Sequence, residues 1–483
     1  MENTISPTRM HAASVTAAQR LDRLPASRFH RKLGFLIGAG MFFDGFDLLM
    51  IGGLMPFMIR SGFVTPARVP SLISYTAAGL LIGSLLAGYL GDRFGRKLLY
   101  QFNLILYGIA SLACAAAPNY DFLLVARFIS AIGMGGEIVS GYGFFGEFLP
   151  PSKRGSWGAI MALSTNVAYP IALAIAAVIV PTYGWRWMFV VAGLPVLAIG
   201  WLRRALPESP RWLERAGNAE AADRVITAIE NQIEGETGHP LPPIQAGTVE
   251  HFTPTQFAPT DLFKGWIAKR TLLACLCWLF AVATQWGFIT FTPMLLVKQG
   301  FLVGTSLNLS LIMSIGAIPG VVAGSFLADR WGRKPTVICS ALIAAALGVA
   351  IPFEANPTVI AVLGFCMATM IFVFIAVVVC VYVPELFPTP ARLSGSGFAT
   401  GVGRVGLIFL PLLMAHIVET LGGPFAFYVL SASSVCLAAS IAVFGVETRN
   451  RSLEEIEFLG EGRTAPGATS QYNSGARSHV GQR

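Results

Sequence analysis

Ionisable side chains inside long apolar stretches are the residues of this sequence that can do chemistry. Asp44 and Asp47 lie three residues apart, so both carboxylates fall on one face of a helix. Arg127 and Glu137 share a second apolar stretch, and Arg404 stands near the middle of another. A charge within lipid costs about 3 kcal/mol or more, so each of these five groups is a functional candidate. Acids in such places suit proton carriage, and a cation suits the binding of a negatively charged group.

The composition indicates a protein whose solvent is largely lipid. Charged residues make up 12% of the 483 residues and hydrophobic residues 54%, which is more apolar surface than a soluble chain can bury. A helix of about 20 apolar residues crosses a bilayer, and twelve stretches are long enough. We therefore predict an all-α integral membrane protein with twelve transmembrane helices. They are expected at 33–59, 71–91, 98–117, 122–146, 157–181, 187–204, 271–295, 306–328, 335–353, 358–384, 394–418 and 424–446.

Basic residues are distributed unevenly around these stretches. Of the 34 Lys and Arg, 28 fall on the side of the membrane that carries both termini and 4 on the other. Loops rich in Lys and Arg stay in the cytoplasm, which predicts a multi-pass protein of the cell inner (plasma) membrane with both termini cytoplasmic. The same bias explains the formal net charge of +8 without nucleic acid as a partner. Membrane lipid is the expected surrounding partner.

The sequence repeats itself after about half its length. Residues 92–97 read Asp-Arg-Phe-Gly-Arg-Lys, and residues 329–334 read Asp-Arg-Trp-Gly-Arg-Lys. Glu-Phe-Leu-Pro at 147–150 returns as Glu-Leu-Phe-Pro at 385–388. Internal repeats of this kind are typical of secondary transporters. The expected domains are a cytoplasmic tail (1–32), a six-helix bundle (33–204), a cytoplasmic linker (205–270), a second six-helix bundle (271–446) and a cytoplasmic tail (447–483).

The repeated loops combine an acid with several cations at one face of the membrane. Arg93 and Arg96 can bridge to Glu147 on a neighbouring helix end, and such pairs can lock one conformation and break in another. A simpler alternative is that the cations only fix the topology. Glu208 is echoed weakly by Glu447 beyond these loops. The predicted cytoplasmic gate comprises Asp92, Arg93, Arg96, Glu147, Arg154, Asp329, Arg330, Arg333, Glu385 and Arg392.

These loops carry a family resemblance. The segment 88–97, Gly-x3-Asp-Arg-x-Gly-Arg-Lys, resembles the signature loop of the major facilitator superfamily, and the second copy departs from it at Ser325, where the first glycine would stand. Residues 127–135, Arg-x5-Gly-x-Gly, and residues 207–213, Pro-Glu-Ser-Pro-Arg-Trp-Leu, are similar to motifs of its sugar-porter-like branch. The resemblance covers about residues 30–458 and implies alternating access between two six-helix bundles.

The buried acids extend this resemblance. Residues 44–47, Asp-Gly-Phe-Asp, resemble the acidic motif in the first helix of the aromatic acid/proton symporters. In proton-coupled relatives a first-helix Asp titrates against a fourth-helix Arg, which implies Asp47 against Arg127 here. The alternative is a static buried ion pair. Glu137 is either a second proton site or a structural acid bonded to a neighbouring helix. The predicted proton-coupling residues are Asp44, Asp47, Arg127 and Glu137.

The second half holds the predicted substrate-binding cation. Residues 403–406, Gly-Arg-Val-Gly, resemble the eleventh-helix pattern of organic-ion and niacin-type transporters. Arg404 presents a planar fork suited to a carboxylate, so we predict that it reads the negative charge of the substrate. The alternative is that it pairs with one of the buried acids. The other predicted substrate-binding residues are Gln285, Trp286, Asn166 and Tyr142.

The motifs favour transport over catalysis. No Walker loop, nucleophile elbow or metal-ligand cluster is present in the sequence, so no enzyme activity, catalytic residue, metal or cofactor is expected. The predicted function is a proton-coupled symporter, acting as a monomer, that imports a small organic carboxylate, with an aromatic acid favoured. Its partners are this small-molecule substrate and the proton. The alternatives are a sugar or polyol porter or a drug exporter on the same fold and, from a different class, a transport-inactive sensor or a channel.

Overall fold

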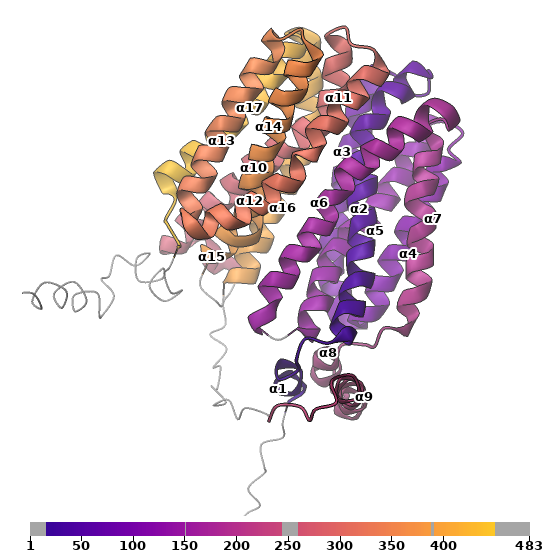
Figure 1. Ribbon diagram of the computed structural model, residues 1–483, viewed down its shortest axis with the longest axis vertical. Helices are drawn as coiled ribbons and strands as arrows, with labels where there is room; N and C mark the ends of the chain where they lie inside the picture. Colours follow the sequence, from indigo (N-terminus) through magenta and orange to yellow (C-terminus); the bar gives the residue numbers. More distant parts are fainter. Residues whose placement is uncertain (1–15, 150, 244–258, 388–390, 450–483) are drawn as a thin grey trace, which may run out of the picture.

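The structure is a computed structural model that describes residues 16–149, 151–243, 259–387 and 391–449. All regular secondary structure in these ranges is helical, which confirms the all-α prediction. In this part of the chain, 11 helices are long and apolar enough to cross a membrane, and one further apolar helix, α7, is shorter. The long helices run side by side along the molecule (Figure 1).

The helices of the first half extend beyond several of the predicted apolar stretches, because helical hydrogen bonding continues past the lipid into flanking polar residues. The first long helix, for example, begins five residues before position 33, after Ser27 in extended backbone. The first half consists of α1 (Ala17–Asp22), α2 (Arg28–Arg60), η1 (Pro66–Arg68), α3 (Val69–Phe94), α4 (Arg96–Ala115), α5 (Tyr120–Phe148), α6 (Pro151–Tyr183), α7 (Arg186–Leu202) and the turn η2 (Arg203–Ala205).

One span of the second half is interrupted. Its two segments meet at Gly316, where a methyl group would strike the Phe365 carbonyl on a neighbouring helix. The second half consists of η3 (Pro259–Phe263), α10 (Gly265–Lys298), α11 (Val303–Ile315), α12 (Ala317–Arg330), α13 (Arg333–Ala350), η4 (Ile351–Phe353), α14 (Pro357–Val377), the π-helical turn η5 (Val378–Tyr382), α15 (Val383–Glu385), α16 (Arg392–Thr420) and α17 (Gly423–Phe444).

Part of the N-terminal tail and of the linker folds into a small helical module. The helix α1 packs on α8 (Pro210–Arg215) and α9 (Ala219–Thr237), below the first half in Figure 1. Glu230 on α9 accepts hydrogen bonds from Arg20 at 2.6 Å and from Arg23 at 2.7 Å. Apolar side chains of α1 and α9 are buried in one cluster. The described parts of the tail and of the linker are therefore packed together as helices.

The two halves touch along α2 and α10, along α3 and α16, and along α6 with α11 and α12. Gly52 on α2 lies so close to α10 that a methyl group would come within 2.7 Å of the Ile289 carbonyl oxygen. Ser74 on α3 donates to the Ile408 carbonyl on α16 at 2.7 Å. We call the end of the bundle that carries the two repeated loops the basic end. Both of these contacts lie in the helix halves remote from the basic end.

Candidate functional site

Asp47 and Arg127 meet in the interior of the first half. Asp47 comes from α2 and Arg127 from α5, and both side chains have an exposed fraction of 0%. The guanidinium forms an ion pair with the carboxylate and also donates to the Asp47 carbonyl at 3.0 Å. The Ser111 hydroxyl on α4 donates to the other carboxylate oxygen at 3.5 Å. A buried charge is tolerated only while it is paired, so opening this pair away from water would require the carboxylate to take up a proton.

Glu137, ten residues further along α5, has a different partner. Its carboxylate accepts a hydrogen bond from Arg203 at 3.0 Å, and both side chains are fully buried. Arg203 directly follows α7 and donates two more hydrogen bonds to the Leu36 carbonyl of α2, at 3.1 and 2.6 Å. The geometry accommodates both interpretations of Glu137, as a proton site and as an acid bonded to a neighbouring segment.

Arg203 is a buried counter-charge that the sequence analysis did not assign to any site. The guanidinium turns back into the bundle because Gly40 leaves space on α2. A methyl group at Gly40 would collide with both the Arg203 guanidinium and the Glu137 carboxylate. Two signals pointed to this arrangement. Arg203 lies inside the predicted stretch 187–204, and a buried Glu137 requires a counter-charge.

Asp44 lies close to both ion pairs, on α2. Its side chain is fully buried, and neither carboxylate oxygen has a hydrogen-bond partner among the described residues. Its charge interacts with those of Glu137, Arg203 and Asp47. An ionised carboxylate without a donor is costly in a buried place, so Asp44 differs from the two paired acids.

Arg404 reaches from α16 of the second half to α3 of the first. Its Nη1 donates to the Leu80 carbonyl at 2.7 Å and to the Ser84 hydroxyl. Asp47 and Glu137 take other cations, and no carboxylate in the described ranges forms an ion pair with Arg404. The alternative in which Arg404 pairs with a buried acid is therefore not realised in this conformation. Both observed partners are neutral, so the positive charge at the junction of the halves is left without a counter-charge.

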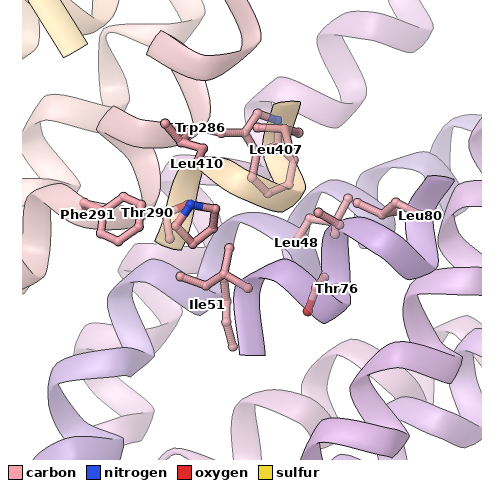
Figure 2. A pocket seen from close by; sticks show the side chains of 12 residues that line it. Leu48, Ile51, Thr76, Leu80, Trp286, Thr290, Phe291, Leu407 and Leu410 are labelled. Carbon is pink, nitrogen blue, oxygen red and sulfur yellow. The ribbon is translucent and has the colours of Figure 1, made fainter. Parts of the chain in front are cut away.

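A small cavity lies between α2 and α3 of the first half and α10 and α16 of the second (Figure 2), and its lining includes Leu80, whose carbonyl accepts the hydrogen bond from Arg404. Its volume is about 20 Å³, which is room for about one water molecule. Its walls are apolar apart from two threonine hydroxyls. A solute of the size of an aromatic acid would therefore require the halves to move apart. The lining residues are Leu48, Ile51, Ile73, Thr76, Ala77, Leu80, Trp286, Thr290, Phe291, Leu407, Leu410 and Pro411.

The other predicted substrate-binding residues do not gather in one place. Trp286 on α10 lines the cavity (Figure 2), and Gln285 next to it is half-buried. Asn166 donates its amide to the Ala162 carbonyl of its own helix at 2.8 Å. Tyr142 is 41% exposed on α5. In this conformation neither Asn166 nor Tyr142 lines the cavity.

Comparison with known proteins places this architecture in one family. A family profile described as "Sugar (and other) transporter" matches residues 36–459. The chain belongs to this family of major facilitator transporters. The inner membrane metabolite transport protein YdjE of Escherichia coli is 31% identical over 442 residues, which cover 90% of this chain and 97% of that protein.

Two further comparisons agree with the family. The niacin transporter NiaP of Acinetobacter baylyi is 30% identical over 440 residues, covering 90% of this transporter and 98% of that protein. The inward-open structure of the xylose transporter XylE from Escherichia coli covers 89% of this transporter at a TM-score of 0.69 and 19% identity, with 99% of that chain matched. This structural likeness shows the shared fold. The relatives are membrane transporters, which confirms that the chain is not an enzyme.

Two of the predicted gate pairs form at the basic end of the transporter. Arg96 bonds to Glu147 at 3.2 Å, and at the equivalent place in the second half Arg333 bonds to Glu385 at 3.3 Å. Asp329 adds an ion pair to Arg333, also at 3.3 Å. Each pair lies within one half, and among the described residues no ion pair joins the halves at this end. In this conformation the pairs brace each half internally.

Other predicted gate residues have different surroundings. Arg93 was expected to bridge to Glu147, but it does not. It donates instead to the Tyr89 hydroxyl at 3.2 Å, at the exposed end of its helix. Arg330 lies over an aromatic ring of its own helix, and Arg392 is half-buried. The side chains of two predicted gate residues lie outside the described part of the structure: Asp92 and Arg154.

Glu208 and Glu447 are functional candidates that the sequence interpretation did not assign to the gate. Glu208 accepts hydrogen bonds from the first two backbone N–H groups of α4, at 3.1 and 3.0 Å. Glu447 does the same for the first two N–H groups of α13, at 3.0 Å each. Gly95 and Gly332 stand immediately before these helices with φ of 104° and 111°, which favours glycine. The weak echo of Glu208 in Glu447 was the available signal.

Proposed function

We propose that this transporter is a proton-coupled symporter that imports a small aromatic carboxylate by alternating access. The observation that carries the proposal is Arg404, a cation at the junction of the two halves whose observed hydrogen-bond partners are neutral. A carboxylate matches the planar guanidinium and supplies the missing negative charge. The relative NiaP is named for niacin, which is a pyridine carboxylate, and this supports an aromatic acid.

The proposed proton-coupling residues are Asp47, Arg127, Glu137 and Asp44. Asp47 exchanges its proton against Arg127, because a carboxylate is ionised while the guanidinium holds it and takes up a proton when the pair opens in a dry cavity. A proton bound from one side and released to the other then drives uptake of the carboxylate. The alternative, a static pair, predicts no effect of the proton gradient on accumulation.

The proposed moving bodies are the bundles 33–204 and 271–446, joined by the linker 205–270, in a monomer within the inner membrane. The basic end is proposed to face the cytoplasm, because short loops rich in Lys and Arg are retained there. The contacts of Gly52 and Ser74 join the halves at the opposite end. These contacts support an inward-facing assignment of this conformation.

A sugar porter is the second candidate. The description of the family and the arabinose-proton symporter of Bacillus subtilis, which is 26% identical, favour it. A sugar has several hydroxyl groups, each of which needs a hydrogen-bond partner once it leaves water. The cavity between the halves offers the hydroxyls of Thr76 and Thr290 within otherwise apolar walls, so the cavity supports an aromatic ring better than a sugar.

Uptake into proteoliposomes tests the proposal. Purified transporter is reconstituted, a pH gradient with an alkaline interior is imposed, and radiolabelled nicotinate, benzoate, 4-hydroxybenzoate and xylose are compared. Accumulation of at least one aromatic acid, abolished by a protonophore, is expected. Accumulation of xylose without any acid would replace the proposal by the sugar porter. Equal uptake with and without the gradient would contradict proton coupling.

A further inference from the structure

Asp44, Glu137 and Arg203 form a buried cluster that is distinct from the Asp47–Arg127 pair. Glu137 bonds to Arg203 through one of its carboxylate oxygens, at 3.0 Å. Its second oxygen and both oxygens of Asp44 have no hydrogen-bond partner in the described part of the chain. All three side chains are fully buried. Asp44 lies one helical turn from Gly40, where an added methyl would meet both Arg203 and Glu137, so two buried carboxylates lie beside one guanidinium.

Neutral groups hold Arg203 on its other side. Its Nε and Nη2 donate to the Leu36 carbonyl, and its Cζ lies 4.3 Å from the centre of the Tyr100 ring. Gly40 leaves the space that the guanidinium fills. Arginine stays charged in proteins, so this cation neutralises one carboxylate. The other carboxylate must be protonated, because a second negative charge would be buried without compensation.

Among the described residues, no other cation pairs with the cluster. Asp47 on α2 is paired with Arg127 of α5. The remaining titratable groups near the cluster are the phenols of Tyr100 and Tyr107 on α4, which carry no charge at neutral pH. Helices α6, α7, α10 and α11 also pack on α2 and have no charged residue in the ranges 157–183, 187–202, 271–297 and 303–315. The charged helix α9 contacts α2 as well, and its Glu236 accepts a hydrogen bond from the backbone N–H of Arg28, the first residue of α2.

We propose that Asp44 and Glu137 share one proton, that Arg203 neutralises whichever of the two is ionised, and that this cluster is a second proton-binding site of the transporter. The inference rests on the proposed symport function and deepens it. If Asp47 were the single site, one proton and one monovalent carboxylate would move no net charge. With the cluster included, two protons accompany each carboxylate, one positive charge crosses per cycle, and the membrane potential contributes to uptake.

Infrared spectroscopy of the purified full-length protein at neutral pH tests the shared proton, because a protonated carboxyl has a C=O band that a carboxylate lacks. Asp44→Asn and Glu137→Gln each leave one acid with one guanidinium, so each is expected to remove the band of the cluster. Arg203→Gln leaves two acids without a cation, so the band area should roughly double. Arg203→Lys keeps the charge and should retain the wild-type band, which separates neutralisation of charge from packing.

Two controls are matched to these variants. Asp47→Asn, in the other pair, and Glu354→Gln, at an exposed position, are expected to leave the band of the cluster unchanged. A wild-type band that survives Asp44→Asn overturns the shared proton. A band that does not grow in Arg203→Gln, with Arg203→Lys folded and unchanged, overturns the role of Arg203.

Charge movement provides a second readout in proteoliposomes. The charge moved for each radiolabelled nicotinate is expected to fall from about one in the wild type to about zero in Asp44→Asn. Electroneutral wild-type uptake would overturn the second site while leaving proton coupling intact. If nicotinate is not transported but the infrared bands change as expected in the variants, the proposed substrate is wrong and the proton shared by Asp44 and Glu137 is still supported.

Discussion

The groups that contact a buried charge in this bundle determine whether the charge is neutralised and which protonation state is favoured. Asp47 accepts hydrogen bonds from a guanidinium and a hydroxyl, which favour its ionised form while the pair is closed, whereas its full burial favours the protonated form once the pair opens. Arg404 donates hydrogen bonds to the Leu80 carbonyl and the Ser84 hydroxyl, which orient its guanidinium without neutralising the positive charge. The first residue therefore suits reversible proton binding, and the second suits a negatively charged substrate.

Asp47→Asn is expected to abolish accumulation of nicotinate driven by a pH gradient and to spare exchange of preloaded nicotinate. The amide cannot release a proton, but it keeps the size and polarity of the side chain. Both activities are measured in proteoliposomes with a radiolabel. Accumulation at the wild-type level by this variant would remove Asp47 from the coupling mechanism.

Arg404 is expected to distinguish an acid from its amide. Nicotinate should bind the wild type at least tenfold more tightly than nicotinamide, because a charge-assisted hydrogen bond contributes about 1.5–3 kcal/mol. Arg404→Ala should lose most of this preference, and Arg404→Lys should bind nicotinate more weakly because the planar fork is lost. Isothermal titration of the purified protein provides the comparison. An unchanged preference in Arg404→Ala would show that Arg404 does not contact the carboxylate.

At the scale of elements, α2 is the helix on which both buried clusters depend. It carries Asp44 and Asp47, and its glycines let other groups approach its backbone. A methyl group at Gly40 would collide with Arg203, and one at Gly45 would strike the Thr165 carbonyl of α6. Close approach at these glycines is why α2 can lie within the bundle with the two acids enclosed.

Gly40→Ala is expected to destabilise the transporter by about 1–3 kcal/mol, because the added methyl displaces Arg203 and Glu137 from their contact. Thermal unfolding of the purified protein, followed by tryptophan fluorescence, measures the effect. Gly143→Ala on α5 is the matched control, since nothing lies within 4 Å of its added methyl. That control should be neutral or should stabilise by up to about 1 kcal/mol through helix propensity. Equal unfolding temperatures for the two variants would contradict the role of Gly40.

The module of α1 and α9 is expected to loosen in acid. Burial raises the pKa of Glu230, but hydrogen bonds from Arg20 and Arg23 outweigh it and lower the pKa below its ordinary value of 4.5. A group with a depressed pKa stabilises the fold above its unfolded pKa and loses this contribution as pH falls through the folded pKa. The protection of α1 from hydrogen exchange, taken relative to the intrinsic exchange rate at the same pH, should therefore fall below about pH 4.5.

Glu230→Gln provides the test of this module at neutral pH, where it should reduce the protection of α1 from hydrogen exchange and so make exchange in α1 faster than in the wild type. Glu220→Gln on the same helix is the control, because its pair with Arg224 is exposed, with side chains 85% and 70% accessible. Exchange in α1 that is equally fast in both variants would show that Glu230 does not hold the module together.

At the scale of the whole molecule, two close contacts between the halves lie away from the basic end, while Arg404 joins the halves near the middle of α3. Ser74 and Ile408 join α3 to α16, and Gly52 brings α2 against α10, all away from the basic end. At the basic end, the described ion pairs lie within each half. Alternating access requires the first set of contacts to open during each cycle.

A thiol cross-link between Ser74→Cys and Ile408→Cys, in a background without native cysteines, is expected to stop transport by holding the halves together. Transport should return when a cleavable cross-link is reduced. The control pair is Ser433→Cys with Phe280→Cys, which has the same hydroxyl-to-carbonyl contact, at 3.1 Å, within the second half. Full activity of the cross-linked Ser74 and Ile408 pair would contradict separation of the halves at this end.

Local patterns in the sequence were sufficient for the helical fold, the two repeated halves and the candidate charges Asp47, Arg127, Glu137 and Arg404. Apolar length, charge bias and repeated motifs are properties of consecutive residues, so no knowledge of packing is needed to read them. The partner of each charge, by contrast, depends on the tertiary structure and not on consecutive residues. Arg203 reaches Glu137 because α7 ends beside Gly40 of α2, and Arg404 reaches Leu80 because α16 crosses to α3. Such partners depend on which helices are neighbours and where a missing side chain leaves space, and folding alone brings those distant segments together.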